Sequence, residues 1–293
     1  MTQIIVGVDA SERADDAVAL AATLARISGA ELLIAHAFPL DAVASPVGLP
    51  DFQRRARQHA DRLLADRVEA AGVPATAVPM PGGSPARKLH ELAERSGAAA
   101  IVIGSTHRGV LGRVFAGTTA ERLLHGAPCP VLVAPRGYRG GELRTILVGH
   151  DGGEESQGAL DVALASGARV RLVRVIAPTI TGSQAAIAGA WIPPVDIERE
   201  SRAVFDREFA GLEGVERELI LGDPVAELAA RSEHADLLLL GSRGYGPHSS
   251  VLLGSVSGAL VRKAACPVML VPRGSGAGAA ELLSGDVTTR QPA

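Results

Sequence analysis

The sequence contains the same series of segments twice, and this internal repeat constrains the fold more than any other feature. The segment IIVGVDAS at residues 4–11 returns as ILVGHDGG at 146–153. The segment LLHGAPCPVLVAPRG at 123–137 returns as LVRKAACPVMLVPRG at 260–274. A repeat of this length has the size of a whole domain and far exceeds the repeat of a solenoid. The chain is therefore predicted to hold two copies of one fold.

The domain boundaries follow from the repeat and from local composition. Residues 136–142 (RGYRGGE) are rich in Gly and Arg, as a short linker should be. We predict one domain at residues 1–138 and a second at 142–273. The last segment, 274–293, consists mainly of small and polar residues, and we expect a disordered tail with one helical turn as its candidate ordered part.

Within each repeat, short apolar segments alternate with amphipathic ones. In the first repeat, QIIVGV at 3–8 is a continuous apolar run typical of a strand buried on both faces, and 51–72 has the spacing of an amphipathic helix. Strands that alternate with helices predict the α/β class, with a doubly wound, five-stranded parallel sheet in each domain. Ligands of such sheets bind beyond the carboxyl ends of the strands, where the winding reverses. We expect that point between the first and fourth strands.

Composition excludes several classes of protein. The chain has 293 residues with 47% apolar side chains, and no apolar run approaches the length of a transmembrane helix. The start, MTQIIVGVDAS, lacks the features of a signal peptide, so we expect a soluble cytoplasmic protein. A net charge of −3 and 3% aromatic residues argue against nucleic acid as a partner. Cys129 and Cys266 each precede a strand, and we interpret them as buried packing residues.

A glycine-rich loop in the second repeat has the features of a phosphate site. Gly241 ends a predicted strand and is expected to let the chain turn sharply, and Gly244 is expected to let the backbone approach a ligand. Gly254 then precedes a predicted helix that opens with three further candidate site residues, Ser255, Val256 and Ser257. Free amides and the helix dipole favour an anion at such a place. The loop lacks the lysine of a Walker A motif.

Each repeat also carries an aspartate just after its first strand. Asp9 and Asp151 lie two residues after Gly7 and Gly149. Their position at the predicted switch point favours a role in the binding site. The alternative is that each carboxylate simply caps the helix that follows.

With these residues in view, the chain resembles the universal stress protein family, in its tandem two-domain form. The resemblance rests on G-x2-G-x9-G-[S/T] followed by a helix and CPVxLVP, and on the opening IIVGVDAS, and it covers nearly the whole chain apart from the tail. It implies a sheet of order 3-2-1-4-5 that binds ATP, with Mg²⁺ as a candidate companion ion. It also implies pairing of the two domains through their last strands, a homodimer as a candidate assembly, and a role in stress survival.

The resemblance assigns roles to individual residues. It implies that the aspartate and a backbone group of the second strand hold adenine, which places Asp151 and Val175 in the second repeat and Asp9 and Ala37 in the first. The motif glycines and the hydroxyl groups at the helix start hold ribose and phosphates.

The first repeat departs from the motif at one position. Gly104, Gly117 and Thr118 fit, but His107 replaces the second glycine. A side chain there either crowds the nucleotide or contacts phosphate from a shifted loop. We therefore expect ATP primarily in the second domain.

Three functions remain open at this stage. The first is an ATP-binding regulatory protein, and the second is an interaction scaffold that works without nucleotide. The third is an enzyme related to nucleotide α-hydrolases, which ranks last because the SGGxDS loop expected after the first strand is missing. No catalytic triad, carboxylate pair or metal cluster stands out, so we expect a protein that is not an enzyme, with slow ATP hydrolysis at most.

Overall fold

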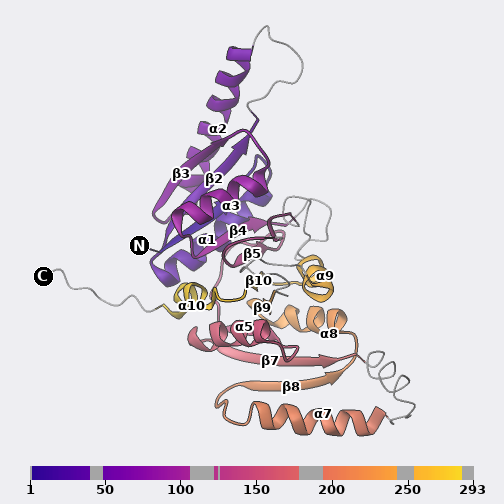
Figure 1. Cartoon of the computed structure of the whole chain (residues 1–293). Helices are drawn as coiled ribbons and strands as arrows, with labels where there is room; N and C mark the ends of the chain where they lie inside the picture. The colour runs from indigo at the N-terminus through magenta and orange to yellow at the C-terminus, as the bar shows by residue number, and fades with distance from the viewer. Residues whose placement is uncertain are drawn as a thin grey trace, which may run out of the picture.

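The structure is a computed structural model. It describes residues 2–39, 49–105, 122–124, 126–177, 194–242 and 254–285. The two repeats lie one above the other, with α2 (Leu49–Ala71) extending from one end of the molecule and α7 (Pro194–Glu208) bordering the other (Figure 1).

Strands and helices alternate through both repeats, as the sequence predicts. The elements of the first repeat are β1 (Gln3–Gly7), α1 (Arg13–Ser28), β2 (Glu31–Phe38), α2 (Leu49–Ala71), β3 (Ala75–Pro81), α3 (Pro85–Ser96), β4 (Ala100–Gly104) and β5 (Val131–Ala134). Those of the second are β6 (Thr145–Gly149), α5 (Glu154–Ala165), β7 (Arg169–Ile176), α7 (Pro194–Glu208), β8 (Glu216–Leu221), α8 (Pro224–Arg231), a short 3-10 helix (Ser232–His234), β9 (Leu237–Gly241), α9 (Ser255–Lys263), β10 (Val268–Val271) and α10 (Gly276–Ser284).

The strands form one ten-stranded sheet with the order β3-β2-β1-β4-β5-β10-β9-β6-β7-β8. Each half is parallel and has the order 3-2-1-4-5, so this prediction is confirmed. The halves join where β5 and β10 pair antiparallel, with Met269 opposite Leu132. The predicted pairing of the two domains within one chain is therefore present. The fully buried central strands place Ile4 and Val6 on one face of the sheet and Ile5 on the other.

The segment between the repeats is held against the first one. The carboxylate of Asp16, buried on α1, accepts hydrogen bonds from the backbone N–H of Gly137 at 3.1 Å and from Nη1 of Arg139 at 2.7 Å. Further on, Asp236 accepts from the backbone N–H groups of Arg144 and Thr145. These bonds fix the start of β6.

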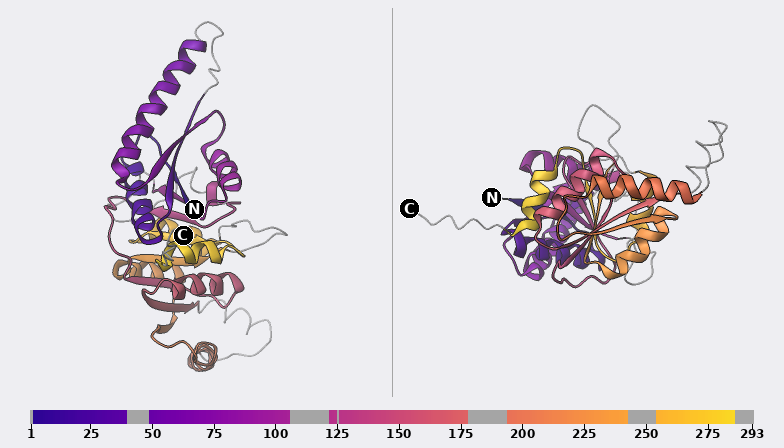
Figure 2. Two further views of the ribbon diagram at one scale, coloured as in Figure 1. Left: turned by 90° about the vertical axis from the view of Figure 1, so that its left-hand side faces the viewer. Right: turned by 90° about the horizontal axis from the view of Figure 1, so that it is seen from below.

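The end of the chain corrects one prediction. Part of the segment expected to be disordered forms α10, whose Ala279, Leu282 and Leu283 are buried. The helix packs against both α5 and α1, so it lies across the junction of the two repeats (Figure 2). The expectation failed because α1 and α5, which cover these side chains, belong to different repeats and come together only after the repeats have paired.

The two cysteines are buried, as expected. Burial raises the pKa of both thiols to about 12, so neither Cys129 nor Cys266 is a thiolate near neutral pH.

Candidate functional site

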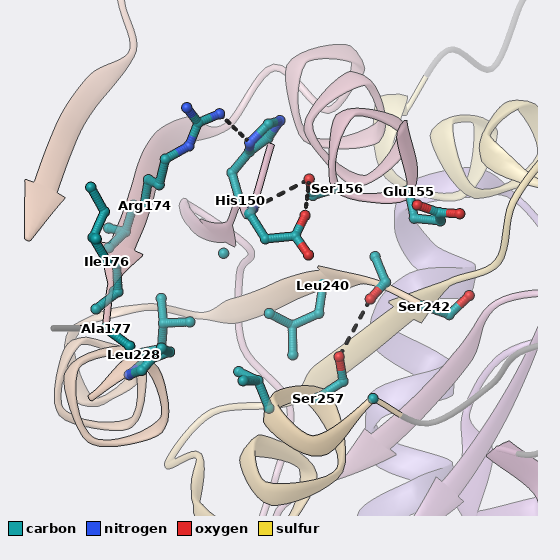
Figure 3. Close-up of a pocket in the computed structure, with 18 residues that line it drawn as sticks. His150, Glu155, Ser156, Arg174, Ile176, Ala177, Leu228, Leu240, Ser242 and Ser257 are labelled. Carbon is teal, nitrogen blue, oxygen red and sulfur yellow. Dashed lines mark hydrogen bonds between the residues drawn. The ribbon is translucent and has the colours of Figure 1, made fainter. Parts of the chain in front are cut away.

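A cavity of about 380 Å³ lies at the carboxyl ends of β6, β7 and β9 in the second repeat (Figure 3). This is the switch point of the second half of the sheet, where β6 pairs with both β7 and β9. The apolar lining residues are Val173, Val175, Ile176, Ala177, Pro224, Leu228, Leu240 and Val256. The polar lining side chains are His150, Asp151, Glu155, Ser156, Arg174, Ser242 and Ser257.

The structure brings most of the predicted second-repeat residues together around this cavity. Those that line it are Gly149, Asp151, Val175, Gly241, Gly254, Val256 and Ser257. Ser255 is the exposed first residue of α9 and does not line the cavity. Gly244 lies outside the described residues.

The Asp151 carboxylate supports the loop between β6 and α5. Its Oδ1 accepts hydrogen bonds from the backbone N–H of Gly153 at 3.0 Å and from the hydroxyl of Ser156 at 2.8 Å. Gly153 is the residue that precedes α5. The residue at the N-cap of α5 is Gly153, so Asp151 braces the loop before the helix and the hydroxyl of Ser156 in its first turn, and it also lines the cavity.

Two glycines let other elements approach the strand ends closely. A Cβ on Gly241 would lie 2.4 Å from the carbonyl carbon of Glu155 in the first turn of α5, and one on Gly149 would lie 2.7 Å from the side chain of Leu240. Gly241 does not have a positive φ. The backbone conformation at this position therefore does not require glycine; the close approach of the α5 backbone, which occupies the space of a side chain, does.

The start of α9 faces the same cavity. As predicted, Gly254 directly precedes the helix; its backbone is extended, and Val256 and Ser257 in the first turn line the cavity. The first N–H groups of a helix have no partner within it, so they are available to a ligand. The hydroxyl of Ser257 donates to the carbonyl oxygen of Gly241 over a long 3.4 Å and stays within reach of the cavity.

Several lining residues were missed by the sequence analysis, among them Glu155, Arg174 and Leu228. They come from α5, β7 and α8, and they have no motif of their own. The one available signal was the alternation of β7, which places Val173 and Val175 on one face and Arg174 on the other.

The first repeat shows the same framework with different charges. Asp9 accepts hydrogen bonds from the backbone N–H and the hydroxyl of Ser11, and Nη2 of Arg13 lies 3.1 Å from its Oδ2. The residue four positions after Asp151 is instead Glu155, an acid. The carboxylate is thus paired with a cation in the first repeat and lies near another acid in the second.

The structure describes some, but not all, of the other site residues predicted in the first repeat. A Cβ on Gly7 would lie 3.0 Å from Leu89 of α3, and one on Gly104 would lie 2.3 Å from the carbonyl oxygen of Arg13. Ala37 is half-buried on β2. The other predicted residues, His107, Gly117 and Thr118, lie outside the described residues.

Two features are absent from the described residues, a membrane-spanning helix and a cluster of metal ligands. No helix among them is both long and apolar enough to span a bilayer. In the same part of the chain, no group of three or more His, Cys, Asp or Glu side chains is placed to hold a metal ion.

Comparison with known proteins gives matches along both repeats. A model of the universal stress protein family matches residues 1–135 and 142–272. The chain is 29% identical over 287 residues to a universal stress protein of Mycolicibacterium smegmatis, covering 92% of this chain and 96% of that one. It is 27% identical over 288 residues to universal stress protein Rv2005c of Mycobacterium tuberculosis, covering 91% and 96%.

A solved structure agrees on the fold. The crystal structure of a universal stress protein from Archaeoglobus fulgidus superimposes with a TM-score of 0.69 at 21% identity and covers 93% of this chain and 98% of that one. The likeness therefore extends over both halves of the ten-stranded sheet.

Proposed function

Because this chain belongs to the universal stress protein family, we propose that it is an ATP-binding regulatory protein of the stress response. The second repeat binds the nucleotide in the cavity between β6, β9 and α9. The first repeat is the weaker candidate, because His107 interrupts its glycine motif. The protein acts in the cytoplasm as an internally paired two-domain chain, and a homodimer is a further candidate.

The observation that carries this proposal is the shape and lining of the second-repeat cavity. Its volume of about 380 Å³ lies in the range of small-molecule sites. Val175 and Leu228, which pack in the same apolar cluster, line the cavity together with Asp151, and this combination suits a purine with polar edges. Gly241, Gly254 and the first amides of α9 lie across the cavity and suit phosphate oxygens.

The charges around the cavity favour binding over turnover. Among the described lining residues, Arg174 is the sole cationic side chain. Its two terminal nitrogens each lie 2.8 Å from an oxygen of Glu208, so they are already paired. Phosphoryl transfer needs cations that neutralise the developing charge. Glu155 adds negative charge to the cavity, and Mg²⁺ bound with ATP would offset it.

The first test is whether ATP stabilises the purified chain. With ATP at about a hundred times Kd, the free energy of unfolding should rise by about 2.7 kcal/mol. Ser255→Glu should weaken ATP binding about tenfold, because a negative charge on the first residue of α9 would repel phosphates bound at the start of that helix. Ser255→Gln, of the same size and without charge, is the matched control. Calorimetric titration of the three proteins measures the difference.

The glutamate substitution is expected to leave the fold intact, because an acid in the first turn of a helix favours the helix dipole. Equal ATP affinity for the glutamate and glutamine variants would contradict the proposed phosphate site. No thermal response to millimolar ATP would favour the scaffold alternative. Rapid release of pyrophosphate or phosphate would instead indicate an enzyme.

A further inference from the structure

Arg174 is the centre of a compact cluster beside the cavity. The side chain is 13% exposed and forms two 2.8 Å bonds to Glu208 at the end of α7. Its guanidinium carbon lies 5.5 Å and 5.2 Å from the ring centres of Phe205 and Phe209. Paired charge and two aromatic faces fix the guanidinium in one position.

The same guanidinium reaches the residue after β6. Nη2 of Arg174 lies 3.0 Å from Nδ1 of His150 (Figure 3). The backbone N–H of Gly152 also lies 3.0 Å from that nitrogen. Both partners are donors, so Nδ1 must accept, and the ring is neutral with its proton on Nε2. The ring is buried and packs edge-on against Phe209.

These bonds form a continuous path from α7 to the binding loop. Glu208 holds Arg174, Arg174 holds His150, and His150 holds the backbone of Gly152. Asp151, which lines the cavity, lies between the last two residues. Gly152 has a φ of +92°, a conformation that glycine adopts readily and other residues rarely do.

The first repeat makes an equivalent link from different groups. The strand registers pair Gly7 with Ala35 and Gly149 with Val173, so His36 corresponds to Arg174. Nδ1 of His36 lies 2.8 Å from the carbonyl oxygen of Val8, the residue that corresponds to His150. In both repeats a side chain of the second strand therefore holds the residue that precedes the aspartate.

We propose that Arg174 is a positioning residue of the second site: held by Glu208, it fixes His150 and Gly152 and thereby the place of Asp151 in the cavity. The effect on ligand affinity rests on the proposed function, whereas the effect on the loop does not. The link predicts that ligand affinity depends on Arg174 through the loop that it supports.

The link should also depend on pH. The groups that face His150 are Arg174 from β7, Glu208 from α7, Gln157 from α5 and its neighbour Asp151. Burial, followed by the charge of Arg174, lowers the pKa of His150 below its usual 6.5. Bonding to Arg174 likewise lowers the pKa of Glu208. Because the pKa of His150 is lower in the folded state than in the unfolded state, the neutral ring stabilises the fold fully above about pH 6.5. This stabilisation is lost as the pH falls through the lowered pKa of the folded state. Protonation of Nδ1 would remove both of its bonds.

The experiment compares Arg174→Met and Arg174→Lys with Arg171→Met. Arg171 lies on the same strand and pairs with Glu216 at 3.3 Å, so its substitution removes a similar ion pair away from His150. Arg174→Met should raise the Kd for ATP about tenfold. Arg174→Lys should recover part of that loss, because its ammonium group can still donate to His150. Arg171→Met should match the wild type.

Two further measurements separate positioning from a general loss of packing. Without nucleotide, hydrogen exchange at the Gly152 amide should accelerate about tenfold in Arg174→Met but not in Arg171→Met. Between pH 7.5 and pH 5.5, the rise in the Kd for ATP should be larger in the wild type than in His150→Val. The ionisation of ATP itself is common to both proteins and cancels in this comparison.

The outcomes are distinct. Unchanged Gly152 exchange in Arg174→Met would overturn the inference even if ATP binds. Changed exchange together with an unchanged Kd would overturn the role in the site. If the wild type fails to bind ATP while Gly152 exchange still depends on Arg174, the proposed function fails and the positioning of the loop stands.

Discussion

Each repeat has a glycine at the end of its fourth strand, where the lack of a Cβ atom lets a neighbouring helix come close. Gly104 and Gly241 occupy the same place in the two repeats, and each lies against the backbone of the helix that follows the first strand. A methyl group at either position would overlap the backbone of Arg13 or Glu155. This contact holds the start of α5 close to β9, so Glu155 and Ser156 reach the cavity.

Substitution of Gly241 by alanine should therefore be costly. We expect the free energy of unfolding to fall by about 1–3 kcal/mol, because the new methyl group meets backbone that cannot move aside. Gly158→Ala in α5 is the control, since a Cβ there meets nothing within 4 Å. That change should raise stability by up to about 1 kcal/mol. Urea unfolding of both variants measures the difference, and equal effects would contradict the argument.

At the scale of one element, α10 shows that a helix can depend on its surroundings more than on its own sequence. The helix has nine residues and would be marginal alone in water. Its stability comes from burying Leu282 and Leu283 against a surface shared by α1 and α5. The helix lies beyond both segments that match the family, and it bridges the two repeats.

Leu282→Ala tests whether α10 contributes to the stability of the whole chain. Leu282 is 0% exposed, so its truncation should lower the free energy of unfolding by about 2–5 kcal/mol. The neighbouring Glu281 is exposed, and Glu281→Ala should change stability by no more than about 0.5 kcal/mol. Thermal unfolding followed by circular dichroism measures both. If α10 did not pack against the rest of the protein, Leu282→Ala and Glu281→Ala would have similar unfolding temperatures.

At the scale of the whole molecule, the antiparallel pairing of β5 with β10 turns two domains into one sheet. Met269 lies in this junction opposite Leu132 and is fully buried. Asp16, which holds Gly137 and Arg139, ties the connecting segment to the first repeat. With a shared core, a bridging helix and a fixed linker, the two repeats should unfold together.

Calorimetry should accordingly show one unfolding transition for the wild type. Met269→Asp would place an unpaired charge in the junction, so we expect a loss of at least about 3 kcal/mol and separation into two transitions. Val204→Asp is the control, because Val204 is 53% exposed on α7. Two well-separated transitions in the wild type would show that the junction does not couple the repeats.

The repeat, the alternation of strands and helices, and the positions of Asp151 and Gly254 were all accessible from the sequence, because they depend on local order and on periodicity. Buried strands are continuous apolar runs, and glycine before a helix is visible as a letter. These features were enough to predict the doubly wound halves and the location of the switch point.

Tertiary structure decided the rest, since it depends on which distant segments come together. The cavity obtains Arg174, Glu155 and Leu228 from three elements that no motif connects. The helical state of residues 276–284 depends on contacts with both α1 and α5, which come together when β5 meets β10. The sequence by itself thus determined the framework of each repeat, through local burial patterns. Contacts between distant segments decided which charged residues line the cavity, why a glycine stands at position 241, and that residues 276–284 form a helix. The energies of these contacts come from surfaces that do not exist until the chain has folded.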